Sequence, residues 1–531
     1  MILSDRQCNQ YFRLVLAAAA LLLFVALGHA DIYILDEAKN AQCAKEMWQR
    51  GDWIVPTFNG ELRTDKPALH YWFMVFSYQL FGFGYWQARL FSAVFGLATI
   101  IMVYRGARRL WSAQVGLFAA AALALSPHFI FEFRLSVPDP YLIFFTTAGL
   151  LCGLLYVQEK TWNWLLLAAV SLALATLAKG PVALALPGLC LLIYIVLKRE
   201  WGIITNGKWL VAAVVYVLVA LPWYLLVHQH TDGAFTQGFL FDHNLNRFSS
   251  EKEGHGANFF IVPAIVLVGM LPFSLFLFSA LKRKMAHWKQ PLFLFSFVVV
   301  LVYVVFFGIS STKLPNYAMP CYPFVSILSA AGMQMVMQGK RKIPVYAWTA
   351  WLLVGLALAV GGYFALKAEG AVLQEAPTAW GLLVLTMLLL AGIAFQQRNA
   401  IAKAWLAVAA GWFLLGAYAF WFAYPRIYEN NPATRAYQEF LKPGDILVAY
   451  KAFNPAFLVQ NHEPGKQIFM FNNPDNLKAF IQSSSNPEAV RILTRKEFAG
   501  ELEGMPLEVI MESKDLFELP TSTILAPKGG N

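Results

Sequence analysis

The sequence has few charged residues for its length. Only 14% of its 531 residues are charged, whereas 58% are apolar, and the mean hydropathy is +0.53. A soluble domain of average composition has about a quarter of its residues charged. The shortage of charge argues against an ordinary soluble protein and predicts a membrane protein.

Cysteine is also scarce. The five cysteines are Cys8, Cys43, Cys152, Cys190 and Cys321, and no two of them form a Cys-x-x-Cys pair. This pattern supports neither a disulfide framework nor a zinc knuckle, so we expect the cysteines to be packing residues.

The net charge of +10 would by itself suit a nucleic-acid partner. The basic residues, however, form short tracts between long apolar runs, which is the pattern of cytoplasmic loops in membrane proteins. We therefore predict a protein surrounded by membrane lipids, with no nucleic-acid partner.

Fourteen stretches are near the length needed to cross a bilayer. They are 11–30, 67–84, 86–104, 113–133, 139–157, 162–178, 181–197, 209–227, 258–281, 291–310, 316–336, 344–366, 379–396 and 402–424. Segment 67–84 is polar and aromatic in places, as expected of an interfacial helix. If this segment does not cross the membrane, all the basic tracts lie on the same side of the membrane, as expected of cytoplasmic loops. We therefore predict thirteen spans, a cytoplasmic N-terminus and an external tail. The first run resembles a signal peptide, but we expect it to stay as an uncleaved anchor.

The predicted domain organisation follows from this count. Residues 1–425 form the transmembrane domain, and within it residues 31–85 form a large first extracytoplasmic loop. Residues 426–531 alternate β-like runs (Asp445–Tyr450, Val490–Thr494 and Leu507–Met511) with a helix-like stretch (Pro474–Ile481). This alternation predicts a small extracytoplasmic α/β domain.

The external loops carry ionisable residues close to membrane depth, where such residues are functional candidates. Asp36 opens the first loop and Asp139 precedes Pro140 at the mouth of a span, although either carboxylate could simply cap a helix. Lys66 precedes the interfacial segment, where it could bind a phosphate or anchor the helix to lipid headgroups.

Two further loops add polar groups on the same side. The segment 228–257 contains His243, Asn244, Arg247 and His255, although it could be a solvated connector. Lys313 and Tyr317 enter a later span. Acids and cations thus gather at one face of the membrane.

This set of residue types suits transfer of a sugar from a lipid phosphate. The leaving phosphate needs cations or a metal ion to stabilise its negative charge, and a hydroxyl acceptor needs a carboxylate base. An enzyme that uses nucleotide sugars would be expected to have a soluble cytoplasmic α/β domain, which the sequence lacks. A lipid-linked sugar flippase would have charges near mid-span, and the predicted spans are nearly free of them.

Motifs in order over residues 31–325 resemble the membrane glycosyltransferases of the C-type fold (GT-C). The nearest branch is the lipid A aminoarabinose transferases and their relatives, which are similar to the protein O-mannosyltransferases. The motifs are Asp36-Glu37, Gly51-Asp52-Trp53-Ile54-Val55-Pro56, Asn59-Gly60, Lys66-Pro67, Tyr71-Trp72, Asp139-Pro140, Lys179-Gly180-Pro181, His243-Asn244, Arg247-Phe248, Lys313-Leu314-Pro315 and Tyr317.

The resemblance implies roles for these residues. Asp36 is the implied catalytic carboxylate, with Glu37 beside it and Asp139 as the second loop carboxylate. The implied substrate-binding residues are Lys66, Arg247 and Tyr317 at the lipid phosphate, with Lys313, His243 and Asn244. Relatives can hold a divalent metal (Zn, Mg or Mn) at positions matching Asp65 and a loop histidine, here His255 or alternatively His243, although they usually have Glu in place of Asp65.

The expected protein is an inverting glycosyltransferase of a bacterial inner membrane with its active site on the periplasmic side. It would move an aminoarabinose-like sugar or a hexose from a polyprenyl phosphate such as undecaprenyl phosphate to an envelope acceptor. Lipid A is the favoured acceptor and protein Ser/Thr the alternative. The Asp-Glu motif continues Ala-Lys where relatives often have Arg-Tyr, so the sugar specificity can differ.

Overall fold

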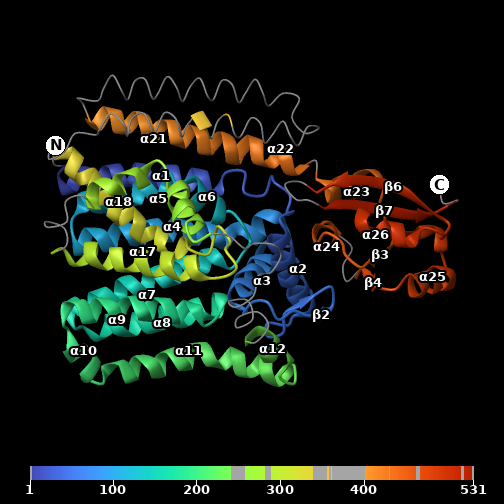
Figure 1. Ribbon diagram of the computed structural model, residues 1–531, viewed down its shortest axis with the longest axis horizontal. Coiled ribbons are helices and arrows are strands. Elements are labelled where there is room, and N and C mark those ends of the chain that lie inside the picture. The colour runs from blue at the N-terminus through green and yellow to red at the C-terminus, as the bar shows by residue number, and fades with distance from the viewer. Residues whose placement is uncertain are drawn as a thin grey trace.

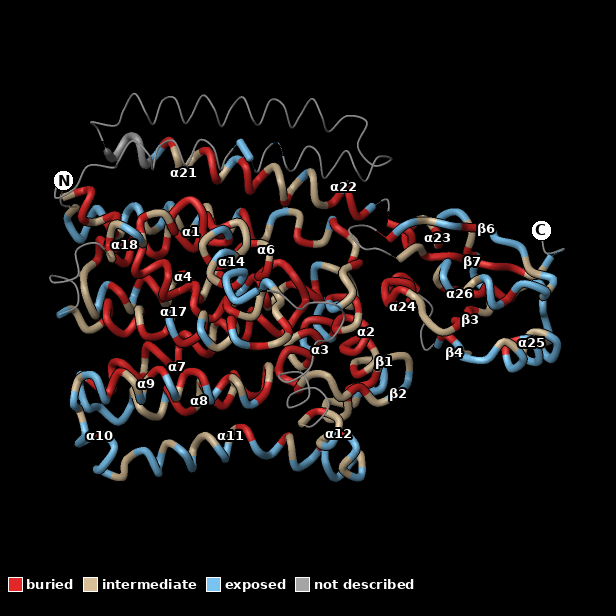
Figure 2. The backbone as a smooth tube through the Cα atoms, in the orientation of Figure 1, coloured by how far each residue is buried: buried red, intermediate tan, exposed pale blue. Residues whose placement is uncertain are grey.

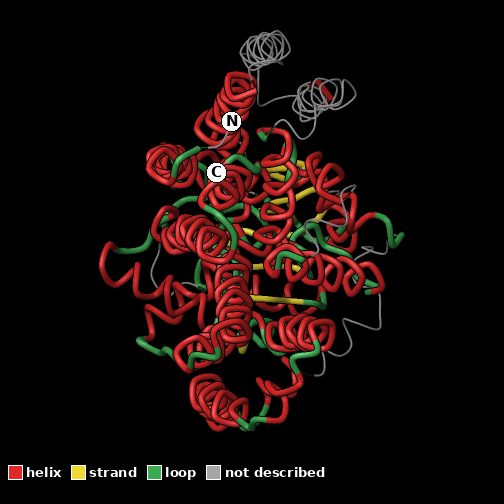
Figure 3. Tube along the Cα trace, turned by 90° about the vertical axis from the view of Figure 1, so that its left-hand side faces the viewer, coloured by secondary structure: helices red, strands yellow, loops and turns green. Residues whose placement is uncertain are grey.

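The computed structural model describes residues 3–240, 258–281, 289–338, 356–357, 360, 401–429, 431–461, 467–515 and 520–528. They form an elongated bundle of helices and a smaller unit, built around a sheet, at one end of the bundle (Figure 1). The N-terminus lies at the opposite end of the bundle from that unit. Seen from the side of the N-terminus, many of the bundle helices appear end on and therefore run side by side (Figure 3).

Within the described ranges, seven helical segments are long and apolar enough to cross a membrane. Six are single helices: α1 (Asp5–Phe24), α4 (Tyr85–Leu110), α7 (Asp139–Glu159), α8 (Trp162–Lys179), α11 (Lys208–His230) and α17 (Pro291–Ile309). The seventh, Leu406–Glu429, runs through α21 (Ile401–Tyr418), η4 (Ala419–Ala423) and α22 (Tyr424–Glu429). A pair bent by 110° would add an eighth span: α14 (Ile261–Gly269) followed by η2 (Phe273–Phe276) and α15 (Leu277–Leu281).

Burial separates the inner helices from the outer ones. The apolar stretch of α7 is 83% buried, whereas that of α11 is only 17% buried (Figure 2). The exposed side chains of α11 include Leu210, Val214 and Leu218. So much exposed apolar surface suits contact with lipid rather than with water. The chain is a multi-pass membrane protein.

The first helix corrects one predicted boundary. The apolar run 11–30 was expected to span, but α1 begins at Asp5 and ends at Phe24. Ser4 and Gln7 form a capping box, in which the Gln7 amide donates to the Ser4 hydroxyl at 3.3 Å and the Ser4 amide donates to the Gln7 side chain at 2.9 Å. The cap starts the helix within a polar segment that hydropathy passes over.

Other boundaries shift for local reasons. The predicted span 113–133 is interrupted: α5 (Ala113–Ala124) ends in a turn, and α6 (Pro127–Glu132) begins after the Ser126 cap with a proline in its first position. The predicted span 316–336 begins later, because η3 (Met319–Cys321) precedes α18 (Tyr322–Met337). The bundle also contains α9 (Val182–Lys198), α10 (Trp201–Thr205) and α12 (Ala234–Gln237). The predicted spans 344–366 and 379–396 fall mostly or wholly outside the described residues.

The first loop is folded at the end of the bundle near the sheet unit (Figure 1). It contains α2 (Leu35–Arg50), the hairpin strands β1 (Thr57–Phe58) and β2 (Glu61–Leu62), and α3 (Leu69–Phe81). At 13 residues α3 is too short to cross a bilayer. It occupies the segment predicted to be interfacial.

The C-terminal unit contains a five-stranded mixed sheet with strand order β4-β3-β5-β7-β6. β3 is parallel to β4 and β5, whereas β7 is antiparallel to β5 and β6. The strands are β3 (Ile446–Tyr450), β4 (Phe469–Phe471), β5 (Val490–Arg495), β6 (Leu507–Lys514) and β7 (Thr521–Pro527). The helices are α23 (Pro432–Glu439), α24 (Ala456–Gln460), α25 (Pro474–Ser483), η5 (Pro487–Ala489), α26 (Lys496–Ala499) and η6 (Gly500–Leu502).

Polar contacts hold this unit against the first loop. The Asn59 side chain donates to the Ile468 carbonyl at 2.7 Å and accepts from the Ile468 amide at 2.9 Å. On α2, the Lys45 ammonium donates to the Asn461 carbonyl at 2.7 Å. The C-terminal unit therefore packs on the helix that carries Asp36 and Glu37.

Candidate active site

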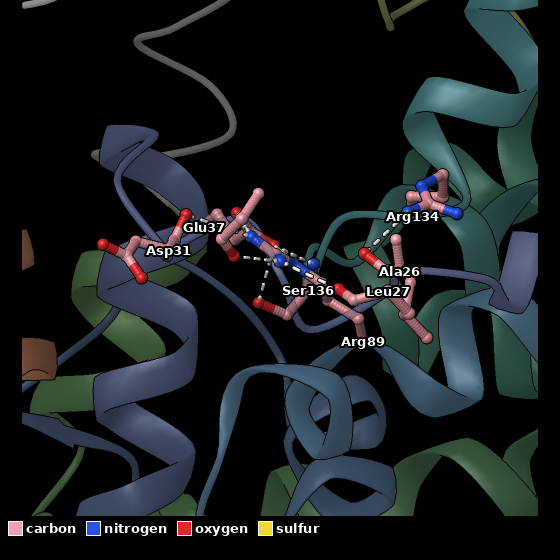
Figure 4. Close-up of polar contacts among 8 residues, drawn as sticks. Ala26, Leu27, Asp31, Glu37, Arg89, Arg134 and Ser136 are labelled. Carbon is pink, nitrogen blue, oxygen red and sulfur yellow. Dashed lines mark hydrogen bonds and ion pairs between the residues drawn. The ribbon is translucent and has the colours of Figure 1, made fainter. Parts of the chain in front are cut away.

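A buried ion pair organises the start of α2. The Arg89 guanidinium, from α4, donates to the two Glu37 oxygens at 2.7 and 2.9 Å (Figure 4). It also donates to the carbonyls of Leu27, Ala30 and Asp31 at 3.0, 2.6 and 3.3 Å. The side chains of Glu37 and Arg89 are 0% and 2% exposed. Both Glu37 oxygens are engaged, which favours a positioning role over the catalytic role predicted for this residue.

The same carboxylate links two segments that are distant in the sequence. Glu37 accepts a hydrogen bond from the Ser136 amide at 2.9 Å, three residues before Asp139 (Figure 4). Arg134, in the same segment, donates to the carbonyls of Leu22, Leu23, Val25 and Ala26 and so caps the end of α1. The loops that carry Asp36 and Asp139 are thus held to each other and to the bundle.

Asp36 lies in the first turn of α2 and is exposed. The N-cap of this helix is Ile34, so Asp36 is not the capping residue that the alternative interpretation required. Its negative charge still lies favourably at the helix N-terminus, and it acts on both Arg63 and Glu132.

Asp139 is the first residue of α7 and does not cap that helix, because Pro138 occupies the capping position. Its carboxylate instead forms an ion pair with Lys179, the last residue of α8. The Lys179 ammonium also lies 5.4 Å from the centroid of the Tyr317 ring. The structure therefore brings together three residues from three separate motifs.

Three cations act electrostatically on His70, which lies on α3. The charges of Arg63, Lys66 and Lys179 all act on its buried ring. Burial, together with these charges, holds the pKa of His70 well below its ordinary value of 6.5, so the ring is neutral. Positive charge that comes from one loop and one helix end thus converges on a single region, as an anionic ligand would require.

Arg63 and Glu132 were not among the predicted site residues. The Arg63 side chain is 5% exposed and its Nε lies 3.4 Å from the Asp65 carboxylate. Glu132, at the end of α6, is 4% exposed, and the charges of Asp139, Lys179 and Asp36 act on its carboxyl. Neither residue carries a sequence signal of its own: Arg63 stands in a polar loop between Leu62 and Thr64, and Glu132 is a single acid between two phenylalanines.

Several predicted residues are not placed. His243, Asn244, Arg247 and His255 lie outside the described residues. Lys313 is placed at the entry to η3 and donates to the Ser310 carbonyl at 2.6 Å.

The predicted metal site is only partly described. Asp65, the one predicted ligand in the described ranges, forms an ion pair with Arg63. Across those ranges no three His, Cys, Asp or Glu residues are grouped as a metal ion would need. A metal at Asp65 therefore depends on His255 and on release of the Arg63 contact.

Comparisons with known proteins indicate the class to which the chain is similar. Residues 65–225 match the family described as dolichyl-phosphate-mannose-protein mannosyltransferase. An uncharacterised protein of Aquifex aeolicus is 30% identical over 327 residues, which cover 60% of this chain and 63% of the relative. The undecaprenyl phosphate-alpha-4-amino-4-deoxy-L-arabinose arabinosyl transferase of Pseudomonas paraeruginosa is 29% identical over 356 residues, which cover 62% and 61%. The chain thus spans about three fifths of the length of the curated relatives it matches.

The fold is shared with a solved structure over nearly the whole chain. The crystal structure of ArnT from Cupriavidus metallidurans bound to undecaprenyl phosphate superposes with a TM-score of 0.78 and 21% identity, covering 97% of this chain and 98% of that one. The protein therefore has the C-type fold of polytopic membrane glycosyltransferases. Within that class it resembles the lipid A aminoarabinose transferases and the protein O-mannosyltransferases, as the motifs had indicated.

Proposed function

We propose that this protein transfers a monosaccharide from a polyprenyl-phosphate donor to an envelope acceptor, with inversion at the anomeric carbon. The observation that carries this proposal is the convergence of two carboxylates, Asp36 and Asp139, with the cations Arg63, Lys66 and Lys179 at one end of the bundle. A carboxylate can activate an acceptor by taking its proton, and cations can stabilise the negative charge of a leaving phosphate.

The proposed reaction forms one bond and breaks one. An acceptor oxygen attacks the anomeric carbon, the bond from that carbon to the phosphate oxygen breaks, and polyprenyl phosphate leaves with the electron pair. Lys66, Arg247 and Tyr317 bind that phosphate, while Lys313, His243 and Asn244 contribute to the substrate site. If the acceptor is a hydroxyl, Asp36 takes its proton. If the acceptor is an ionised phosphate, no proton moves and Asp36 acts through its charge.

The pair of Asp139 and Lys179 has a supporting role in this scheme. Lys179 neutralises Asp139 and at the same time contacts Tyr317. The pair joins the first residue of α7 to the last residue of α8 beside Tyr317. Asp139 is therefore proposed to orient the substrate rather than to compete with Asp36 for the proton.

An aminoarabinose-like sugar is the proposed group transferred, because relatives such as that of Pseudomonas paraeruginosa are named for this donor. Lipid A is the proposed acceptor, because the motifs of the chain resemble those of the lipid A aminoarabinose transferases. The alternative is transfer of a hexose to protein Ser/Thr. It is supported by the match of residues 65–225 to the protein mannosyltransferase family.

We also propose that the chain crosses the bacterial inner membrane thirteen times, with the active site and the C-terminal unit on the periplasmic side. This orientation is supported by the basic loops, which all lie on one side of the membrane when the chain crosses it thirteen times, because cytoplasmic loops are rich in Lys and Arg. A divalent metal between Asp65 and His255 is a further proposal. Turnover before and after exhaustive chelation, with re-addition of Zn, Mg or Mn, would decide it.

The experiment for the main proposal uses the full chain in liposomes. Labelled aminoarabinose or mannose on undecaprenyl phosphate is offered with lipid A or with Ser/Thr peptides as acceptor. We expect label to move from the aminoarabinose donor to lipid A, and to move more slowly in the Asp36→Asn variant. Transfer to peptide alone would favour the alternative acceptor, and no transfer from any lipid-linked donor would refute the proposed function.

A further inference from the structure

Glu132 is held in place by a short, well-capped helix. The Ser126 hydroxyl accepts from the Phe129 amide at the start of α6 and donates to the Gly269 carbonyl at 2.6 Å. His128, one helical turn before Glu132, has its Nδ1 2.7 Å from the Tyr322 hydroxyl. Residues four apart lie on the same face of a helix, so α6 directs both side chains toward the same side.

That side is the candidate active site. The charges of Asp139 and Asp36 act on the Glu132 carboxyl, as does the charge of Lys179, and the Asn316 side chain forms a hydrogen bond with it. Asp139 also acts on His128. Glu132 therefore belongs to the same group of residues as the two predicted carboxylates.

One Glu132 oxygen is unused. Among the described residues, the buried Oε1 has no hydrogen-bond partner. Lys179, whose charge acts on the Glu132 carboxyl, is already paired with Asp139. A buried carboxylate without its own counter-charge is strongly destabilised, so this one needs a proton or an incoming cation.

An ammonium group fits this site better than the other ligands considered. It supplies a positive charge and three N–H donors, which can be shared between the Glu132 oxygen and the neighbouring Asn316 side chain. A neutral hydroxyl supplies no positive charge, so it would fit only a protonated Glu132, and that is the form which Glu132→Gln imitates in the test below. A metal ion would need more ligands than the described residues bring together there.

We propose that Glu132 binds the ammonium group of an amino sugar carried by the lipid donor and so determines which sugar is transferred. This inference rests on the proposed function and adds its sugar specificity. Glu132 contacts the sugar in this assignment, while Asp36 and the phosphate-binding cations act at the reacting atoms.

The test compares two donors that differ in one group. One is undecaprenyl phosphate carrying 4-amino-4-deoxyarabinose, and the other carries arabinose, with a hydroxyl in place of the amino group. The kcat/KM of each donor is measured in liposomes for the wild type, Glu132→Gln and Glu132→Asp. A hydrogen bond to a charged group predicts that Glu132→Gln lowers the amino-to-neutral ratio of kcat/KM by about 10- to 100-fold. Glu132→Asp should keep part of the preference, because it retains the charge.

The matched control is Glu159→Gln at the far end of α7, where the carboxylate pairs with Arg109. It should leave the ratio as in the wild type. Equal losses on both donors in Glu132→Gln, together with lower thermal stability, would show an internal ion pair and overturn the inference. A wild type that transfers only mannose would overturn the inference and leave the glycosyltransferase activity standing. Transfer from no donor would refute both.

Discussion

Replacing Glu37 with glutamine keeps the shape of a buried side chain and removes its charge. Every backbone or guanidinium group that faces its two oxygens is a donor: two N–H groups of Arg89 and the amide of Ser136. Whichever way the new amide is turned, its NH₂ group meets another N–H. Arg89 would also be left as a buried cation bound only to carbonyls.

The expected cost follows from this geometry. Removing one partner of a buried ion pair costs about 3–5 kcal/mol, and we expect Glu37→Gln to fall in that range. Arg89→Met should cost at least as much, because it also removes the donors to the Leu27, Ala30 and Asp31 carbonyls.

The chain contains a matched control for this prediction. Glu159 accepts two hydrogen bonds from Arg109 at 3.0 and 2.9 Å, in the same forked geometry, but these side chains are 34% and 53% exposed. An exposed pair contributes at most about 1 kcal/mol. Glu159→Gln should therefore be nearly neutral, although it removes an equivalent charge.

The assay is thermal unfolding in detergent, followed by tryptophan fluorescence, with sugar transfer measured well below the unfolding temperature. We expect the order of destabilisation Arg89→Met, Glu37→Gln, Glu159→Gln, and a loss of transfer in folded Glu37→Gln because Ser136 no longer holds the Asp139 loop. A Glu37→Gln protein as stable and active as Glu159→Gln would refute the positioning role.

Four further predictions concern chemistry, binding, pH and topology. Asp36→Asn should retain the fold and lose roughly 10²–10⁴-fold in turnover if the acceptor is a hydroxyl; a folded variant with full turnover would remove Asp36 from the mechanism. Lys66→Ala should weaken binding of undecaprenyl phosphate and Lys66→Arg should recover only part of it, whereas Lys160→Ala, which alters an exposed pair with Glu200, should bind normally. Burial lowers the pKa of Lys45 from 10.5 to about 8, so the unfolded chain binds more protons between these values. Stability should therefore rise with pH across that window by at most about 3 kcal/mol, and a Lys45→Met protein with the same pH profile would contradict the assignment. Reporter fusions after Trp111 and Lys284 should be cytoplasmic and a fusion after Asn531 extracytoplasmic; a cytoplasmic tail would overturn the thirteen-span count.

Local patterns in the sequence were enough to predict much of the architecture. A membrane helix needs about twenty apolar residues in a row, so α4, α7, α8, α11 and α17 lie where the apolar runs are. Local patterns were also sufficient in the tail, where β3, β5 and β6 lie at the short β-like runs of the sequence. The start of α1 also depends on a local signal, the capping box formed by Ser4 and Gln7. A search for apolar runs does not detect this signal, because the residues of the box are polar.

The roles of the charged residues were decided by tertiary structure. Glu37 and Arg89 are 52 positions apart, and Lys179 and Asp139 are 40 apart. Which acid meets which cation depends on how the helices pack, and no local pattern records it. Asp36 and Glu37 are neighbours with the same charge, yet one is exposed and the other fully buried. Successive residues on a helix point about 100° apart, and only the packing of the bundle determined that Glu37 faces Arg89 while Asp36 is exposed.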